Sequence, residues 1–295
     1  MSDAPFGRVL TAMVTPFAAD GSLDLDRACA LADRLVTQGN DGLVISGTTG
    51  ESPTTTRQEK ADLLRAVVDA VGGRAQVLGG VGTYDTAGSI ELARDAEKAG
   101  AHGLLAVTPY YSRPPQAGLV AHFRALADST ALPVMLYDIP GRTGMALTTA
   151  TLLELAQHPQ IVALKDAKED LAATSQVLAG CDLAVYCGSD ALNLPTLALG
   201  GVGFVSVVSH LATPQLVELV QAYDAGEVAR ARDINLRLQP AYTGLFRTQG
   251  VILSKAALGL LGFPVGPVRM PLIDATEEQI NVLQQDLRDA GLVPA

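Results

Sequence analysis

The sequence is poor in cysteine and in basic residues, and each shortage excludes a class of protein. It has three cysteines without C-x-x-C spacing, which excludes a disulfide framework or a cysteine-rich zinc site and indicates reduced thiols. Its 21 Lys and Arg are outnumbered by 31 Asp and Glu, and the net charge of −10 disfavours a nucleic-acid binder or a protein drawn to an anionic membrane. We therefore expect the cationic contacts to any anionic substrate to be few and local.

Long apolar runs and targeting patterns are also missing. No segment approaches the roughly 18 residues of a membrane span, and the N-terminal segment MSDAPFGRVL lacks the basic and apolar regions of a secretory signal. Hydrophobic residues still make up 48% of the 295 residues, so the chain can bury a large core. We expect a cytoplasmic protein with neither a membrane nor a nucleic-acid partner.

Short apolar and β-branched segments recur at intervals that suit one strand and one helix. Eight are expected to be strands, at 10–15, 42–46, 76–79, 103–108, 133–137, 161–165, 183–187 and 203–207. Stretches with helical spacing lie between them, for example at 25–35, 59–71, 89–99, 117–127 and 147–156. Apolar strands alternating with helices predict an α/β protein with a parallel sheet, and eight units favour a closed (β/α)₈ TIM barrel over an open sheet.

The strand rhythm stops near residue 225. We expect residues 1–225 to form the barrel and residues 226–295 to form a helical C-terminal extension packed on it. The extension is predicted to hold helices at 226–245, 251–261 and 276–290. The last of these opens with Thr-Glu-Glu-Gln, the pattern of a capping box.

Lys165 is the most informative residue for chemistry. It ends the apolar segment Ile161–Leu164, and strand alternation would turn its side chain into the barrel and Asp166 away from it. Burial favours the neutral form of an amine, and a neutral amine can attack a ketone to form a Schiff base. A lysine that extends to solvent or binds a phosphate is an equally weighted alternative.

Tyr137 ends the neighbouring predicted strand, which places its phenol in the same barrel mouth as Lys165. A tyrosine there can move protons while an imine forms. The alternative is an ordinary core residue. The four histidines lie outside the motifs at the strand ends, so tyrosine is the better proton carrier.

Two loops could bind carboxylates. Gly47–Glu51 (GTTGE) follows the second strand and suits either a helix cap or a nest of backbone amides with threonine hydroxyls as further donors. It lacks P-loop spacing. Arg142 lies in a Pro-Gly turn, where it is either a solvated charge or a bidentate clamp for a substrate carboxylate.

Taken together, the motifs resemble the dihydrodipicolinate synthase family of pyruvate-dependent class I aldolases. The matching segments are LTAMVTPF, GTTGES, VTPYY followed by RPPQ, YDIPGRTG, IVALKDA and GFVSV. They occur in the family's order, and the likeness continues into the C-terminal helices. It therefore covers essentially the whole chain.

The resemblance implies a condensation of pyruvate with L-aspartate 4-semialdehyde in lysine and diaminopimelate biosynthesis, without a metal or organic cofactor. It implies a homotetramer built as a dimer of dimers. By this resemblance, Lys165 would form the Schiff base with pyruvate and Tyr137 would transfer protons. Thr48 would link Tyr137 through a hydroxyl relay to Tyr111, which would reach a neighbouring active site. Thr49 and the backbone of Val205 would bind pyruvate, and Arg142 would bind the carboxylate of the aldehyde.

The nearest alternatives are N-acetylneuraminate lyase and the 2-keto-3-deoxy sugar acid aldolases, which share the lysine and tyrosine. Arg142 favours a short amino-acid aldehyde as the second substrate, because it can bind that substrate's carboxylate, whereas the sugar aldolases tend to carry an apolar residue in this turn. A non-catalytic keto-acid binding barrel is less favoured because it needs no nucleophile. The chain departs from the family pattern in two places. Asp138 stands where asparagine is frequent, and Asp166–Glu169 follows Lys165 where the family more often has a glutamate and a small Thr/Ser-Gly ending. Strand alternation would point Asp138 away from the mouth.

The resemblance also bears on feedback by lysine. Lysine-sensitive relatives carry histidines at the positions of Arg57 and Lys60, and an asparagine and a glutamate at those of Tyr84 and Gly88. Two cations and a lost anion disfavour an ammonium ligand. We therefore expect weak or absent lysine feedback.

Overall fold

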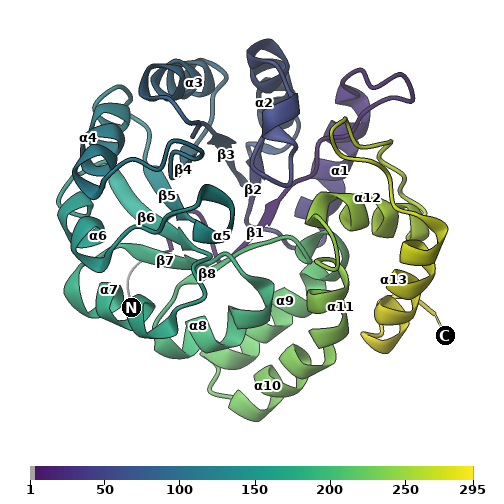
Figure 1. The fold of residues 1–295 in the computed structure, drawn as a ribbon. Coiled ribbons are helices and arrows are strands. Elements are labelled where there is room, and N and C mark those ends of the chain that lie inside the picture. The colour runs from purple at the N-terminus through teal and green to yellow at the C-terminus, as the bar shows by residue number, and fades with distance from the viewer. Residues whose placement is uncertain (1–3, 295) are drawn as a thin grey trace.

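The computed structural model describes residues 4–294, and the eight predicted strands form a closed parallel barrel. Each strand pairs with its neighbour along the chain, and β8 closes the barrel against β1 (Figure 1). The (β/α)₈ prediction is confirmed. The strands are β1 (Val9–Ala12), β2 (Gly42–Ile45), β3 (Gln76–Gly80), β4 (Gly103–Val107), β5 (Val134–Asp138), β6 (Ile161–Asp166), β7 (Ala184–Cys187) and β8 (Gly203–Ser206).

The strands lack a polar face because both of their sides are covered. Every residue of β1, β2, β5, β7 and β8 is buried, as expected for a sheet filled on the inside and covered by helices on the outside. The short apolar segments in the sequence follow from this burial. Polar groups are therefore confined to the strand ends, where the loops begin.

A ring of helices surrounds the strands (Figure 1). Several helices begin earlier than their apolar spacing predicted, because a capping residue sets the start and the buried face begins about a turn later. Thr56 and Glu59 form a capping box at α2, and Asp85 caps α3. The helices are α1 (Leu25–Thr37), α2 (Arg57–Val71), α3 (Thr86–Lys98), α4 (Gln116–Ala127), α5 (Pro140–Thr143), α6 (Thr149–Leu155), α7 (Leu171–Gly180), α8 (Asn193–Leu199) and α9 (Ser209–Asp224).

The C-terminal part is helical, as predicted, but the single helix expected at 226–245 is wrong. The chain there forms α10 (Val228–Arg237) and α11 (Gln239–Gly244), and Pro240 lies in the first turn of α11. Proline has no N–H to continue the hydrogen bonding of α10, but it fits a helix start. Next come α12 (Gly250–Leu260) and α13 (Glu277–Asp289), which begins with the predicted capping box at Thr276.

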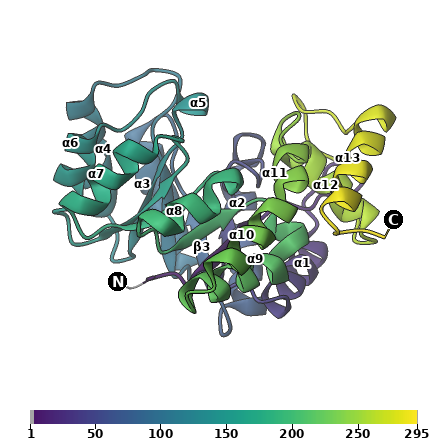
Figure 2. The ribbon, with the colours of Figure 1, turned by 90° about the horizontal axis from the view of Figure 1, so that it is seen from below.

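The C-terminal helices lie on one side of the barrel. Figure 2 shows α12 and α13 at the end of the molecule opposite α4, α6 and α7. The core of buried apolar side chains runs from the barrel into α12 and α13. The boundary at 225/226 stays a prediction, and the outermost residues of the two predicted domains, 1–3 and 295, lie outside the described residues.

No helix among residues 4–294 is long and apolar enough to cross a membrane.

Candidate active site

A cavity of about 300 Å³ lies at the carboxyl-terminal ends of the strands, where barrels of this type carry their chemistry. Thr48, Tyr137 and Arg142 line it, as the sequence predicted. The C-terminal part supplies further lining, from Gln249, Pro271 and Leu272. The cavity is thus built from barrel loops and from a segment that follows the barrel.

Lys165 and Tyr137 lie side by side where β6 and β5 end; Tyr137 lines the cavity, whereas Lys165 is not among its lining residues. They are paired in register on β6 and β5, and the Nζ of Lys165 lies 4.2 Å from the centroid of the Tyr137 ring. Lys165 is only 4% exposed, so its side chain enters the barrel as predicted. Asp166 points outward and accepts a hydrogen bond from the Thr174 hydroxyl. The amine of Lys165 therefore lies against the aromatic ring of Tyr137.

Space around Lys165 depends on Gly188, which follows β7. A methyl group in place of its hydrogen would lie 3.0 Å from the Cγ and Cε of Lys165. A larger residue would push the lysine stem from its place. The sequence showed Gly188 after a strand but gave no sign that it adjoins the lysine.

The half-buried Lys60 and the buried Lys255 are engaged elsewhere. Lys60 donates to the Ser52 carbonyl and to Thr55, and burial lowers its pKa to about 8. Lys255 forms an ion pair with Glu51 at 2.7 Å, whereas Lys165 takes part in no ion pair within residues 4–294. The barrel lysine is therefore the shielded lysine whose amine is not held in an ion pair and lies against Tyr137, which lines the cavity.

The Gly47–Glu51 loop is a tight turn. Gly50 and Ser52 both donate to the Gly47 carbonyl, at 3.1 and 3.3 Å. Across the described residues, no protein oxygen accepts from the backbone N–H groups of Thr48 and Thr49. Two neighbouring free amides suit a carboxylate. Thr49 is buried, while Thr48 faces the cavity.

The predicted hydroxyl relay is not assembled within one chain. Tyr111 is 94% exposed and lies outside the cavity lining, which includes Tyr110 instead. Within the part of the chain that the structure describes, Thr48 and Tyr137 share no hydrogen bond. Val205 is fully buried on β8, and its backbone role stays a prediction.

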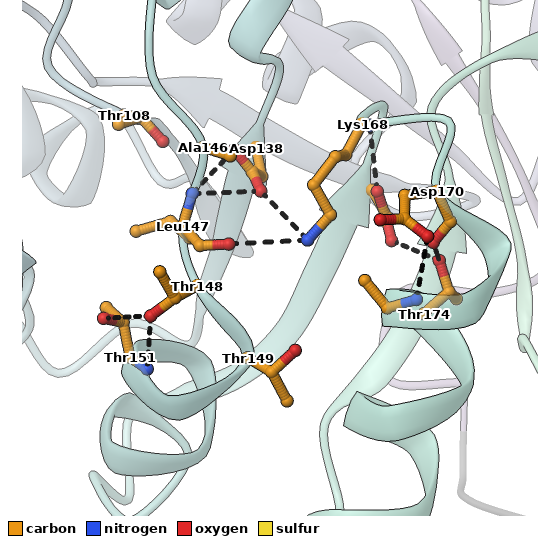
Figure 3. Close-up of polar contacts among 12 residues, drawn as sticks. Thr108, Asp138, Ala146, Leu147, Thr148, Thr149, Thr151, Lys168, Asp170 and Thr174 are labelled. Carbon is orange, nitrogen blue, oxygen red and sulfur yellow. Dashed lines mark hydrogen bonds and ion pairs between the residues drawn. The ribbon is translucent and has the colours of Figure 1, made fainter.

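Arg142 is exposed on the short helix α5, which ends at Gly144 in the left-handed conformation. The base of this loop is fixed by Asp138, which accepts the N–H of Leu147 with both oxygens at 3.2 Å (Figure 3). The Nζ of Lys168 lies 3.7 Å from Asp138 and donates to the Leu147 carbonyl. As predicted, Asp138 points away from the mouth.

Burial raises the pKa of Asp138 to about 6, against the opposing effects of the Leu147 N–H and of Lys168. The nearby Asp166 raises it further. This carboxyl therefore changes charge closer to neutrality than an ordinary aspartate.

The histidines do not contribute to the cavity. His210 is fully buried, accepts the Val14 N–H at 3.0 Å, and has its pKa lowered to about 4 by burial. It joins the end of β1 to the start of α9. Among residues 4–294, no group of three His, Cys, Asp or Glu is placed to hold a metal ion.

Sequence reasoning missed the residues that reach the cavity from the C-terminal part. The side-chain oxygen of Gln249 accepts a hydrogen bond from the Val251 N–H at the start of α12. Pro271 and Leu272 lie in the loop before α13. No periodicity or motif marks a loop residue that meets a distant site.

Comparison with known proteins gives one consistent result. The model of the dihydrodipicolinate synthetase family matches residues 5–290. A 4-hydroxy-tetrahydrodipicolinate synthase of Acidothermus cellulolyticus is 64% identical over 98% of this chain and 94% of its own, and the 4-hydroxy-tetrahydrodipicolinate synthase 2 of Streptomyces coelicolor is 61% identical over 98% and 96%. The crystal structure of DHDPS from Cyanidioschyzon merolae with lysine bound has a TM-score of 0.96 at 43% identity, covering 99% of this chain and 100% of that one.

Proposed function

This chain belongs to the dihydrodipicolinate synthetase family, and from that premise we propose the residues by which it condenses pyruvate with L-aspartate 4-semialdehyde. It is a lyase-type condensing enzyme with 4-hydroxy-tetrahydrodipicolinate synthase activity, in lysine and diaminopimelate biosynthesis. The observation that supports the assignment is the buried Lys165 amine against the ring of Tyr137, which lines the cavity.

Lys165 is the nucleophile. Its Nζ attacks the ketone carbon of pyruvate, Tyr137 protonates the departing hydroxyl, and water leaves as the imine forms. The imine withdraws electrons, so the pyruvate methyl loses a proton and becomes an enamine. The enamine carbon attacks the aldehyde carbon, and the resulting alkoxide takes a proton. The amino group of the condensed product then attacks the imine, which closes the ring and releases Lys165.

Each substrate carboxylate has its own site. The free amides of Thr48 and Thr49, with the Thr49 hydroxyl and the Val205 backbone, hold the carboxylate of pyruvate. Arg142 holds the carboxylate of the aldehyde at the outer rim of the cavity. This division keeps the two substrates on opposite sides of the bond that forms. The reaction needs no metal or organic cofactor.

Tyr111 acts from a neighbouring subunit. Its 94% exposure and its place outside the cavity of its own chain support a contribution to a second site. Thr48 then links Tyr137 to the partner's phenol. This arrangement favours the homotetramer, built from tight dimers, that the family resemblance implies. The three free cysteines suit a reducing compartment, and we place the enzyme in the cytoplasm.

Trapping with borohydride tests the assignment. Incubation with pyruvate and borohydride should reduce the imine to a stable adduct on Lys165 among the five lysines of the chain. Lys165→Arg should abolish the adduct and the coupled condensation while the fold is retained. Peptide mapping that places the adduct on Lys60, Lys168 or Lys255, or that finds none, would overturn the Schiff-base role of Lys165.

A further inference from the structure

A buried ion pair outside the reacting groups joins the Gly47–Glu51 loop to the C-terminal part. The carboxylate of Glu51 meets the Nζ of Lys255 on α12 at 2.7 Å, and both side chains are almost completely buried. Lys255 also donates to the Pro267 carbonyl at 2.6 Å. The chemistry proposed above uses neither residue.

Glu51 is held in an unusual way for a loop glutamate. Its φ of 56° lies in the left-handed region, which a residue with a side chain adopts only when its surroundings impose it. Its second oxygen accepts the backbone N–H of Arg269 at 2.8 Å. Both carboxylate oxygens therefore bind to the C-terminal part, and the backbone of Glu51 directly continues the turn that carries Thr48 and Thr49.

Arg269 makes this anchor rigid. Its guanidinium binds the Glu59 carboxylate, the Gly21 carbonyl and the Thr54 carbonyl. It also lies over the Phe17 ring, 4.1 Å from the centroid, and the Nζ of Lys255 lies 4.3 Å from the same centroid. The segment that receives Glu51 is thus fixed to α2 and to the loop after β1.

We propose that Glu51 is a positioning residue, which sets the two free amides of the Thr48–Thr49 turn through its contacts with Lys255 and with the Arg269 backbone. The C-terminal part thereby acts on pyruvate binding without touching pyruvate. This inference rests on the proposed function, which places the pyruvate carboxylate at those amides. A buried ion pair contributes little stability compared with well-packed apolar residues, but it fixes geometry.

The test compares Glu51→Gln with Lys255→Met in the full-length enzyme. Each should raise the KM for pyruvate roughly tenfold, with kcat changed by less than about threefold and the KM for the aldehyde unchanged, because only uniform binding of the carboxylate is weakened. The two variants remove the same contact, one at the acid and one at the amine, so the test needs only one of them to fold. Lys255→Arg keeps the charge and should recover most of the pyruvate affinity.

The double variant Glu51→Gln/Lys255→Met separates positioning from stability. Removing both charges leaves no unpaired ion, so the midpoint of thermal unfolding should return toward the wild-type value. The KM for pyruvate should stay raised, because the contact that sets the turn is still missing. Recovery of both quantities would overturn the proposal.

Asp286→Asn is the matched control. Asp286 is another largely buried C-terminal carboxylate, which joins α13 to Arg247 and does not touch the turn. Removing this carboxylate should lower the unfolding midpoint without changing the KM for pyruvate. A rise in the pyruvate KM equal to that of the Glu51 variant would refute the specific role of Glu51.

The borohydride experiment separates this inference from the proposed function. If the wild-type enzyme forms no adduct, the proposed function fails. If the adduct forms but the KM for pyruvate is unchanged in both single variants, only this inference is refuted.

Discussion

The behaviour of each lysine in this enzyme follows from its neighbours. Lys60, Lys168 and Lys255 are all shielded from solvent, yet each contacts a carbonyl, hydroxyl or carboxylate oxygen. Lys165 has an aromatic face beside it instead. Burial alone therefore does not distinguish Lys165 from the other shielded lysines, whereas the position of its amine against Tyr137, which lines the cavity, does.

Arg142 should separate the binding of the two substrates. Arg142→Ala removes a charge-assisted contact of about 1.5–3 kcal/mol, so kcat/KM for the aldehyde should fall roughly ten- to a hundredfold. Borohydride trapping of pyruvate on Lys165 should continue unchanged, because the other carboxylate site is intact. Steady-state kinetics in the coupled assay measure the first effect and peptide mapping measures the second. Unchanged kinetics would move the clamp elsewhere and reopen the sugar-aldolase alternative.

Asp138 should make the stability of the protein depend on pH. Its pKa is raised from 3.8 to about 6, so the folded state binds this proton more tightly than the unfolded state does. The resulting stabilisation is present below about pH 4 and is lost as the pH rises through about 6. A rise in the pKa from 3.8 to about 6 corresponds to a stabilisation of the folded state of at most about 3 kcal/mol, reached only at low pH.

Asp138→Asn removes this titration and leaves one oxygen to accept the Leu147 N–H. The stability of the variant relative to wild type, measured as the difference in their free energies of unfolding, should therefore be about 1–1.5 kcal/mol higher at pH 8 than at pH 5. Chemical unfolding at both pH values and at one protein concentration measures the difference. Asp233→Asn, at an exposed carboxylate, is the control and should show no such difference. An equal difference in both variants would exclude Asp138 as its source.

At the scale of elements, α2 and α3 are neighbouring helices of the ring around the barrel, and charged side chains join them (Figure 1). Arg57 on α2 forms ion pairs with Glu91 and Asp95 on α3, so its charge joins the two helices. The N–H of Gly88 donates to Asp85 at 2.7 Å, where lysine-sensitive relatives would carry a glutamate. This surface is organised by contacts within the chain.

Lysine should inhibit this enzyme weakly or not at all. Glu59 and Asp85 are the acids of this surface that could substitute for the missing glutamate, but both are engaged, since Glu59 binds Arg269 and Asp85 caps α3. An ammonium group would meet Arg57 and Lys60 without a free anion. Titration of free lysine to millimolar concentrations in the coupled assay measures the effect. Strong and saturable inhibition would contradict the prediction.

For the whole molecule, the exposure of Tyr111 predicts that active sites are shared between subunits. Tyr111→Phe and Lys165→Arg should each be nearly inactive alone. If they are dissociated, mixed and reassembled, a mixed dimer has one site with both an intact lysine and a partner's tyrosine. Random pairing then restores about a quarter of wild-type activity. The coupled assay measures recovery against each variant treated alone, and no recovery would place the function of Tyr111 within its own chain.

The sequence by itself determined the barrel, because the features that specify it are local. Each strand is a short apolar segment whose burial on both faces is visible in its residues, and each helix carries its own apolar spacing. The positions of Lys165 and Tyr137 followed from the same logic, since both end a strand and parallel strands end at one mouth. The break at Pro240 was also present in the sequence, but helical spacing on both sides hid it.

Only the tertiary structure decided which distant residues complete the site. Glu51 meets Lys255, Gly188 meets Lys165, and the loop with Pro271 and Leu272 reaches the cavity, although no local pattern links these positions. The contacts of Glu51 and of the loop with Pro271 and Leu272 depend on the path of the chain after α9 and on which side of the barrel it packs, whereas Gly188 meets Lys165 because β7 lies beside β6. Alternation and capping act over a few residues, whereas the approach of two remote loops is set by the packing of the whole core.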